Sequence, residues 1–409
     1  MPPESNRKPI VLTLIGAYWP GNGGSGPNLS VKGMFGALDD EFTFLRVSLD
    51  RPAGQGAALI ESGRWFDGPA GAVRYCSPSP VRLGARGLAD ILRSTHYDLL
   101  LLNGFHDREF TIPALILRKL GLAPARPTIV SPRGEFSSPA RALKSGRKLA
   151  YGILARQFRL LDDVWLHATS AEELEDIRRG FPFAKGYLTA PNVRKLGAPP
   201  THIAATGGVC RLLFLARIAR VKNLDLALKA LTQVRAEVAF DIYGPKEDGR
   251  YWAECEALIA ALPPNVSVRY GGEIANEAVP GALAHYDLLL LPSRSENFGH
   301  AIFEALSCGV PALIGDATPW RRLESDAAGW DLSLDDPRAF ARKIDGFAAM
   351  DATARARLRA GARARAERWV RDSDAVEQTR RMFRAVLETP SAPVPETANS
   401  RGSYATPRG

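Results

Sequence analysis

The sequence predicts an α/β protein built from two doubly wound parallel sheets. Three observations support this fold class. Apolar runs alternate with amphipathic stretches along the chain, the apolar runs are continuous, and they are too numerous for a single sheet. Continuous apolar runs are typical of strands that helices cover on both faces. A repeated strand–helix order favours parallel sheets of the doubly wound type.

The expected elements follow one another along the whole chain. Apolar runs predict strands that begin at Ile10, Tyr97, Pro127, Val164, Gly186, Arg211, Val238, Val266, Tyr286 and Val310. Amphipathic stretches predict helices at 113–120, 224–234, 252–262 and 301–308, and a further helix begins near Asn28.

The segment 191–208 is rich in Pro and Gly and has no hydrophobic periodicity, so we place the domain boundary there. The prediction is an N-terminal domain over 1–195 and a C-terminal domain over 196–372, facing each other across a cleft. The tail 389–409 is rich in Pro, Ser and Thr and is expected to be disordered.

Composition excludes several classes of protein. The 409 residues are 45% hydrophobic and 24% charged, which excludes a wholly disordered chain. The four cysteines show no paired spacing, which excludes a disulfide scaffold and a structural zinc site. No apolar run approaches the ~20 residues of a membrane span, and the first strand is too short for a signal peptide. We therefore expect a cytoplasmic protein with reduced thiols.

The net charge of +9 is concentrated in the first half of the chain, where residues 1–195 hold 26 basic and 18 acidic residues. Segment 133–159 has seven basic residues and one acidic residue, and segment 351–371 has seven Arg and two acidic residues. Each segment is interpreted as a solvated helix face or as a surface for anionic lipid headgroups or a polyphosphate. Neither interleaves aromatic residues with its charges, so nucleic acid is not an expected partner.

A glycine-rich turn, which includes Gly23 and Gly24, lies between the first strand and the helix near Asn28. Such a turn lets the backbone approach a phosphate or sugar at a helix N-terminus, and it also occurs as a plain loop. A dinucleotide-binding fingerprint starts in the same way. Asp50 is its candidate ribose-binding acid, although it lies 24 residues after Gly26 and follows a poor strand.

Two cations, Arg217 and Lys222, follow the strand that ends near Leu215. The loop that leaves a parallel strand is where such sheets bind ligands. Arg binds two phosphate oxygens with its planar fork and Lys adds a point charge, so the pair predicts a diphosphate site. The alternative is two unrelated surface cations.

The strongest motif covers 293–311, where a strand ends, a loop follows, and a helix begins. Glu296 lies in the loop and Glu304 eight residues later in the helix. Between them come Asn297, Phe298, Gly299 and His300. Two carboxylates and free amides at a helix N-terminus can bind several hydroxyls together. A nucleotide sugar offers that set of groups, whereas the alternative for Glu304 is a solvated helical acid.

The combination of Arg217, Lys222 and the Glu296–Glu304 pair, each after its own strand, resembles the GT-B glycosyltransferases, specifically the large retaining family usually numbered four. The resemblance extends to about residue 388. Further local segments agree with a bacterial polysaccharide branch of that family: Ser131–Glu135, His167–Ser170, Pro191-Asn192, Tyr243–Pro245 and Thr318–Trp320.

The resemblance implies a role for each matching residue. Arg217 and Lys222 would hold the donor diphosphate, which Gly23 and Gly24 would approach from the first domain. Glu304 would hold the ribose hydroxyls. Glu296 and the 297–300 loop (Asn297, Phe298, Gly299, His300) would hold the donor sugar. Tyr243, Gly244 and Ile274 would border the base, Arg133 would lie on the acceptor side, and a final helix over about 373–388 would cross back onto the first domain.

One residue departs from the family pattern. Many members place a His directly after the strand that here ends at Asn103, whereas the nearest imidazole in this chain is His106. We keep two roles open for His106, contact with the donor sugar and a purely structural one.

The reaction implied is the retaining transfer of a sugar from a nucleotide diphosphate sugar to a hydroxyl of a glycan or a lipid-linked glycan, without a cofactor. No metal is expected, because the one Asp-x-Asp, Asp372 to Asp374, follows an Arg-rich helix and is better suited to cap the next one. Two alternatives remain: a non-enzymatic nucleotide-sugar or polyphosphate binder, and an NAD(P)-dependent enzyme. An anionic membrane is a further candidate partner.

Overall fold

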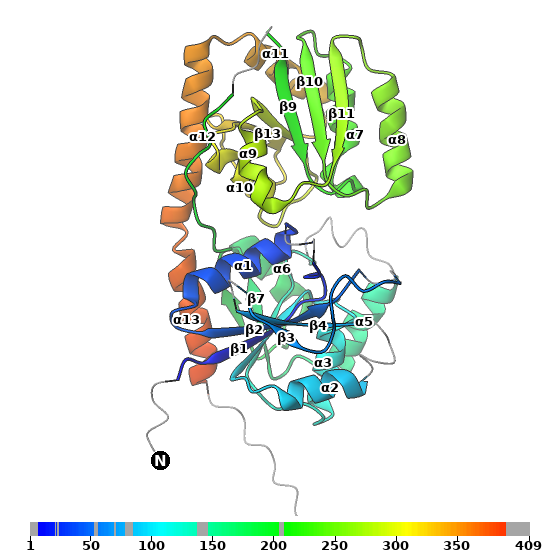
Figure 1. Cartoon of the computed structure of the whole chain (residues 1–409), viewed down its shortest axis with the longest axis vertical. Helices are drawn as coiled ribbons and strands as arrows, with labels where there is room; N and C mark the ends of the chain where they lie inside the picture. The colour runs from blue at the N-terminus through cyan, green and yellow to red at the C-terminus, as the bar shows by residue number, and fades with distance from the viewer. Residues whose placement is uncertain are drawn as a thin grey trace, which may run out of the picture.

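The computed structural model describes residues 7–20, 22, 24–52, 56–68, 71–77, 85–136, 146–203 and 208–389. Gly23, segment 137–145 within the first basic segment, and the tail from 390 onward lie outside the described residues. Figure 1 shows two α/β domains stacked along the long axis, with the strands β9, β10 and β11 of the second domain pointing toward the first. The carboxyl ends of these parallel strands therefore face the other domain.

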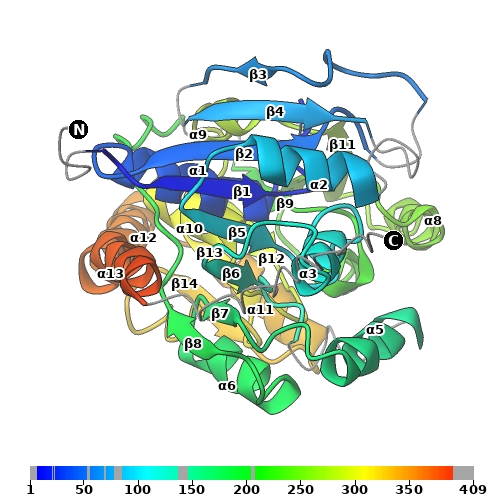
Figure 2. The same ribbon diagram turned by 90° about the horizontal axis from the view of Figure 1, so that it is seen from below.

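The first domain holds an eight-stranded sheet in the order β3-β4-β2-β1-β5-β6-β7-β8, visible from top to bottom in Figure 2. The strands are β1 (Ile10–Leu14), β2 (Thr43–Leu49), β3 (Trp65–Phe66), β4 (Ala72–Cys76), β5 (Leu99–Asn103), β6 (Thr128–Ser131), β7 (Val164–Ala168) and β8 (Gly186–Thr189). All neighbours pair in parallel except β3 with β4. The helices are α1 (Gly26–Leu38), α2 (Ala85–Ser94), α3 (Thr111–Lys119), α5 (Gly146–Gln157) and α6 (Ala171–Gly180). Two apolar clusters lie on the two faces of this sheet.

The second domain holds a six-stranded parallel sheet in the order β11-β10-β9-β12-β13-β14. Its strands are β9 (Cys210–Leu215), β10 (Val238–Tyr243), β11 (Val266–Gly272), β12 (Leu288–Leu291), β13 (Ala312–Gly315) and β14 (Gly329–Leu332). Its helices are η1 (Arg220–Lys222), α7 (Leu224–Leu231), α8 (Gly249–Ala260), η2 (Asn276–Ala278), α9 (Val279–Leu283), α10 (His300–Ser307) and α11 (Pro337–Ala348). One large apolar cluster fills this domain. The α/β fold class with two parallel sheets is thereby confirmed.

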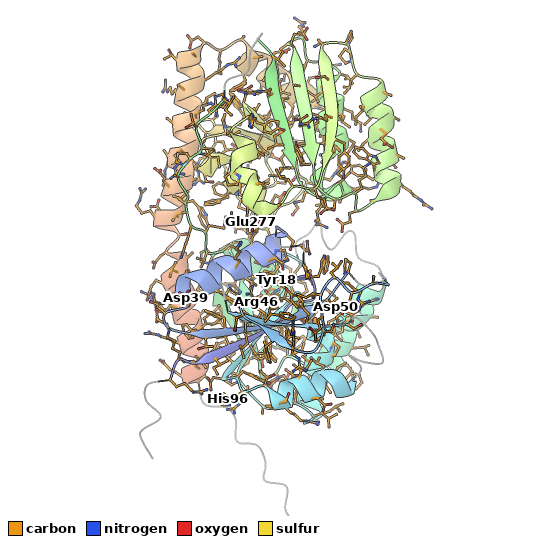
Figure 3. The ribbon with its side chains drawn as sticks, in the orientation of Figure 1. Tyr18, Asp39, Arg46, Asp50, His96 and Glu277 are labelled. Carbon is orange, nitrogen blue, oxygen red and sulfur yellow. The ribbon has the colours of Figure 1, made fainter. Side chains whose placement is uncertain are left out.

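The strand β2 corrects the prediction that the segment before Asp50 is a poor strand. It is a seven-residue central strand that pairs with both β1 and β4. Arg46 interrupts its apolar run, yet this side chain is buried. Its guanidinium lies 4.5 Å from the centre of the Tyr18 ring and bonds the carbonyl of Gly71, as the labelled pair in Figure 3 illustrates. These partners compensate the burial of a charge, and they cannot be read from the sequence pattern.

The end of the chain runs along both domains. Helix α12 (Ala352–Asp372) packs against α10 of the second domain, and α13 (Ala375–Glu388) packs against α1 of the first, on the same side of the molecule in Figure 1. Asp374 occupies the N-cap position of α13 with φ at 46°, but its side chain makes no capping hydrogen bond. The segment from β8 to β9 forms a second crossing between the domains, and it is extended rather than helical over residues 190–203.

Candidate active site

Lys222 and Glu296 form a buried ion pair at the carboxyl ends of two neighbouring strands. Lys222 ends η1, which follows β9, and Glu296 lies in the loop after β12. The Lys222 Nζ is 2.6 Å from Glu296 Oε1, which also accepts a hydrogen bond from the Ser293 hydroxyl at 2.7 Å. The two side chains are 16% and 8% exposed. The pair therefore holds an ammonium group rigidly beside the start of α10.

Three backbone amides follow directly after Glu296 in the loop before α10. Within the described part of the chain, the backbone N–H groups of Asn297, Phe298 and Gly299 donate no hydrogen bond. The chain turns sharply here, because Gly299 has φ of 81° and precedes the first residue of α10. Free amides and the positive end of the helix dipole attract anions and hydroxyl oxygens.

Packing behind the loop fixes its shape. The Phe298 ring is buried against Trp320, Phe303 and Trp369. The Trp320 indole N–H donates to the Phe298 carbonyl at 2.6 Å. A rigid aromatic base of this kind keeps the amides in place without a ligand.

Arg217 does not join the Lys222–Glu296 pair. Its side chain is 52% exposed and forms an ion pair with Glu247. Nearby, Gly244 has φ of 139°, and a Cβ on it would lie 2.0 Å from the carbonyl oxygen of Ala216. The ends of β9 and β10 thus approach each other closely because residue 244 is glycine.

Glu304 lies in α10 and is bound by a residue that the sequence analysis did not single out. Arg194 donates from Nη2 to Glu304 Oε1 at 3.0 Å, and both side chains are largely buried. Burial raises the pKa of Glu304, while the charge of Arg194 opposes that shift. The Arg194 guanidinium also lies 5.0 Å from the centre of the Phe303 ring.

His300 connects Arg194 to the first domain. Its Nδ1 is 3.4 Å from Arg194 Nη1, and its Nε2 is 3.2 Å from the Ser30 hydroxyl of α1. Arg is a donor alone, so Nδ1 accepts and the proton resides on Nε2, which donates to Ser30 Oγ. Ser30 in turn donates to the Gly26 carbonyl at 3.1 Å. Burial and the neighbouring cations hold the pKa of His300 well below its usual range, so the imidazole is neutral.

A second contact between the domains involves Asn297. Its side-chain amide donates to Thr169 Oγ1 at 3.0 Å, and Thr169 donates to the buried carboxylate of Glu173. Glu173 also accepts from the Gly134 amide. Gly134 has φ of 81°, and a Cβ there would lie 2.8 Å from the Asn297 Cβ. The loop that carries Asn297 in the second domain thus packs on the loop after β6.

Arg133 lies on the first-domain side of this contact. Its guanidinium donates to the side-chain oxygens of Asn103 and Asn192 at 3.2–3.3 Å. Burial lowers the pKa of Arg133 to about 10, and the charge of Glu173 opposes the shift. The group remains protonated at neutral pH.

His106 is held by Glu135. Its Nδ1 lies 2.5 Å from Glu135 Oε2, which also accepts from the His106 backbone amide at 2.9 Å. The imidazole ring packs against Phe105, Phe136 and Tyr151. The carboxylate accepts the Nδ1–H of the ring, so Glu135 fixes the orientation of the imidazole.

The remaining predicted residues lie at the edges of the site. Gly24 lies close to η2 of the second domain: a Cβ added to Gly24 would lie 3.5 Å from the Asn276 Cβ. Close by, Lys32 of α1 pairs with Glu277, which Figure 3 labels at the face of the second domain. The Tyr243 ring packs on Gly271, and Ile274 packs on the second-domain core. Asp50 is fully buried, and its carboxylate oxygens are already bonded by Arg51 and Ser62.

Sequence reasoning missed Arg194, Thr169 and Ser30. Arg194 falls in the aperiodic segment that was interpreted as a linker, and Ser30 looks like an ordinary helical residue. Their partners are 110, 128 and 270 residues away along the chain. Two signals were available: Arg194 adjoins the Pro191-Asn192 segment, and Thr169 lies within the His167–Ser170 segment.

The comparisons with known proteins agree with this geometry. The fold matches sucrose-phosphate synthase from Thermosynechococcus elongatus with a TM-score of 0.69 at 16% identity, covering 93% of this chain and 100% of that one. It also matches Anabaena HepE in complex with UDP-glucose, with a TM-score of 0.66 at 17% identity over 92% of this chain and 99% of that one. The chain therefore has the GT-B fold.

Residues 207–365 match the family described as glycosyl transferases group 1. A D-inositol 3-phosphate glycosyltransferase of Xylanimonas cellulosilytica is 30% identical over 222 residues, 50% of this chain and 53% of that protein. The alpha-D-kanosaminyltransferase of Streptomyces kanamyceticus is 30% identical over 161 residues, 34% of this chain and 40% of that protein. The matches thus span about half, or less, of these curated relatives. The resemblance to GT-B glycosyltransferases is confirmed.

Proposed function

We propose that this protein transfers a glycosyl group from a nucleotide diphosphate sugar to a hydroxyl of a glycan or lipid-linked glycan acceptor, with retention and without a metal. The observation that carries the proposal is the group of hydrogen-bond donors beside the start of α10. The ammonium of Lys222 and the unbonded amides of residues 297–299 surround the carboxyl ends of β9 and β12. Open parallel sheets bind ligands at such strand ends.

The proposed chemistry follows from where charge develops. Breaking the anomeric C–O bond builds positive charge on the sugar and negative charge on the departing diphosphate. A fixed cation stabilises this transition state more than the ground state. Lys222, held by Glu296, is such a cation. Arg217 would supply a second cation by leaving Glu247 and binding the diphosphate instead. This exchange costs little, because an exposed ion pair contributes only about 0–1 kcal/mol.

Glu296 is proposed to orient donor hydroxyls and to make no covalent bond with the sugar. One of its oxygens already accepts from Lys222 and Ser293, which lowers its nucleophilicity. The acceptor hydroxyl would attack on the face of the leaving group and pass its proton to the departing phosphate oxygen. Mass spectrometry after mixing with donor tests this, because a glycosyl adduct on Glu296 would contradict it.

Relatives and neighbours support the donor class. The HepE structures contain UDP, UDP-glucose or UDP and glucose, and a Mycobacterium tuberculosis relative is described as a GDP-mannose-dependent mannosyltransferase. A thermal-shift panel of UDP-, GDP- and ADP-sugars would identify the base, because binding to the folded state raises the melting temperature. A protein that binds a donor but neither hydrolyses nor transfers it would be a binding protein, and one stabilised by NAD(P) alone would be an oxidoreductase.

Lys222→Ala tests the diphosphate role directly. Loss of one preorganised charge partner costs about 2–4 kcal/mol of barrier, so kcat should fall by about 30-fold or more. Arg220→Ala is the matched control, because the neighbouring Arg220 points away to Glu254 on α8. Circular dichroism would check that both variants fold. Near-normal turnover of Lys222→Ala would reject the role.

Metal independence is also part of the proposal. In the described ranges, no three His, Cys, Asp or Glu side chains gather as a metal site would need. We expect EDTA to leave turnover unchanged. A loss of rate that Mg²⁺ or Mn²⁺ restores would count against this part of the proposal.

Association with an anionic membrane is proposed from one surface of the first domain. Among the described residues, six large apolar side chains are exposed near the C-terminal ends of α3 and α5: Ile116, Leu120, Leu122, Ile153, Leu154 and Phe158. The two ends touch, since Lys119 Nζ donates to the Arg159 carbonyl at 3.3 Å. Basic residues flank the patch, including Lys119, Arg156 and Arg159. Apolar side chains among basic ones suit the interface of an anionic bilayer. No described helix has the length and apolar character to cross a bilayer.

Vesicle sedimentation would test the patch. Vesicles that contain phosphatidylglycerol should retain the protein at low salt and release it at high salt, and purely zwitterionic vesicles should retain less. Phe158→Ser should weaken retention. Ile203→Ser is the control, because Ile203 is also exposed but lies outside the patch. Equal retention by both lipid types would remove the membrane proposal.

A further inference from the structure

We propose that Arg194 is a positioning residue for the donor: its guanidinium holds the Glu304 carboxylate in the orientation that receives the ribose hydroxyls. This inference rests on the proposed function, because it assumes that Glu304 faces the ribose of a nucleotide. It adds a group from the segment between the domains to the proposed ribose contact, whose other residue, Glu304, belongs to the second domain.

The geometry leaves part of Glu304 available. Arg194 Nη2 bonds Oε1 at 3.0 Å, while within the described part of the chain Oε2 accepts no hydrogen bond. An ionised carboxylate accepts hydrogen bonds alone, so a free oxygen beside a fixed one suits a pair of neighbouring hydroxyls. Without a cation, a carboxyl this buried would favour its neutral form.

Arg194 itself is held on several sides. Its guanidinium stacks near Phe303, and its second terminal nitrogen approaches His300 Nδ1. The backbone around it is anchored as well, because Lys195 Nζ bonds the Gly36 carbonyl of α1 and Arg363 of α12 bonds the Gly197 carbonyl. A guanidinium fixed in this way orients Glu304 before any ligand arrives, which reduces the cost of ordering on binding.

An opposite role for the same contact is self-inhibition, in which Arg194 occupies Glu304 and the nucleotide must displace it. The two roles predict opposite changes in nucleotide affinity when Arg194 is removed. Removal of a positioning group weakens binding of the nucleotide, whereas removal of a competitor strengthens it.

The experiment compares ribose and dideoxyribose nucleotides. Isothermal titration calorimetry would measure the Kd of UDP, GDP and ADP for the wild-type chain, and then of the 2′,3′-dideoxy form of the tightest one. The wild type should bind the dideoxy form about tenfold or more weakly, since hydrogen bonds to a charged group are lost. Arg194→Gln should weaken binding of the ribose form to a similar degree and leave binding of the dideoxy form nearly unchanged. The ratio of the two Kd values should then fall to about threefold or less.

Four further variants control for folding and for the role of Glu304. Arg194→Lys keeps the charge and should restore part of the preference. Glu304→Gln should lose the preference, and Arg194→Gln combined with Glu304→Gln should lose no more than Glu304→Gln alone. Arg235→Gln, which replaces an exposed arginine that the site does not use, should keep it. A merely structural role for Arg194 would weaken both nucleotides equally.

The outcomes separate this inference from the proposed function. If the wild type binds no nucleoside diphosphate, the proposed function fails. If it binds and prefers ribose, but Arg194→Gln keeps the preference or binds more tightly, only the inference about Arg194 is overturned. A wild type without a ribose preference overturns that inference as well.

Discussion

At the scale of single residues, the histidines His167 and His300 are neutral and connect separate segments. His167 accepts from the Ser131 hydroxyl at 2.8 Å and donates to the Ala190 carbonyl at 2.9 Å, so it joins β6, β7 and the end of β8. Burial, assisted by the charge of Arg133, lowers the pKa of His167 to about 3. A neutral tautomer with one donor and one acceptor is the form that fits both partners.

This lowered pKa predicts a pH dependence of stability. In the unfolded chain, His167 takes up a proton as the pH falls below about 6.5, whereas in the folded chain it stays neutral until about pH 3. The stabilising contribution is therefore complete above pH 6.5 and is lost as the pH falls, amounting to about 2 kcal/mol between pH 7 and 5.

Urea unfolding of the wild type and His167→Gln at pH 7, 6 and 5 would measure this contribution. The gap in unfolding free energy between the two proteins should narrow as the pH falls. His96→Gln is the control, because His96 lies on the surface, where Figure 3 labels it at the end of the first domain. A constant gap for His167→Gln would contradict the assignment.

At the scale of elements, the start of α10 determines the candidate site. Gly299 adopts a left-handed conformation with φ of 81°, and an added Cβ would lie 2.9 Å from Ile302 Cδ1 and 3.2 Å from Trp320 Nε1. Any other residue would strain the backbone and displace the aromatic base that supports the loop.

Gly299→Ala should therefore destabilise the protein by about 1–2 kcal/mol and weaken nucleotide binding. Differential scanning calorimetry and the thermal-shift panel would measure the two effects. Gly346→Ala in α11 is the matched control, since no heavy atom lies within 4 Å of the added Cβ. That substitution should be neutral or stabilising by up to about 1 kcal/mol. Equal melting temperatures for the two variants would argue against a strained turn.

The secondary-structure elements also show which features could be predicted from the sequence. Long apolar runs such as Leu288–Leu291 were predicted correctly, because a strand buried on both faces has no polar positions. The strand β2 was missed, because Arg46 interrupts its apolar run. The contacts of this buried arginine with Tyr18 and Gly71 cannot be predicted from a local pattern. The strands β4 and β14 were not predicted either.

At the scale of the whole molecule, two crossings connect the domains. Helix α13 packs on the first domain through Phe383, whose ring contacts Phe42 and Phe44 at centroid distances of 5.3 and 6.2 Å. Arg380 and Arg384 add ion pairs to Glu41. The helix therefore ties the end of the chain to the first domain largely by apolar burial.

Phe383→Ala should cost about 3–5 kcal/mol of stability, as expected for a large buried aromatic side chain. Arg384→Ala should change stability by less than about 1 kcal/mol, because its ion pair is exposed. Chemical unfolding of both variants, followed by tryptophan fluorescence, would test the comparison. Similar losses for the two would mean that the ion pairs, and not the aromatic cluster, hold α13.

The same scale explains the contacts between the two domains. Asn297 meets Thr169, His300 meets Ser30, and Arg194 meets Glu304. Each pair joins residues that are more than 100 positions apart. None of the three partners Thr169, Ser30 and Arg194 was assigned a role from the sequence, although the residues of the 296–304 motif were.

The sequence by itself determined the α/β class, the placement of the chemistry-bearing loops after strands, and the types of side chain at those loops, since hydrophobic periodicity and local motifs depend on near neighbours. Only the tertiary structure decided which of these side chains meet. It pairs Lys222 with Glu296, turns Arg217 outward to Glu247, and brings Arg194 to Glu304. Such pairings arise where sheets and crossings bring distant segments together, and burial then selects the partners that satisfy each charge.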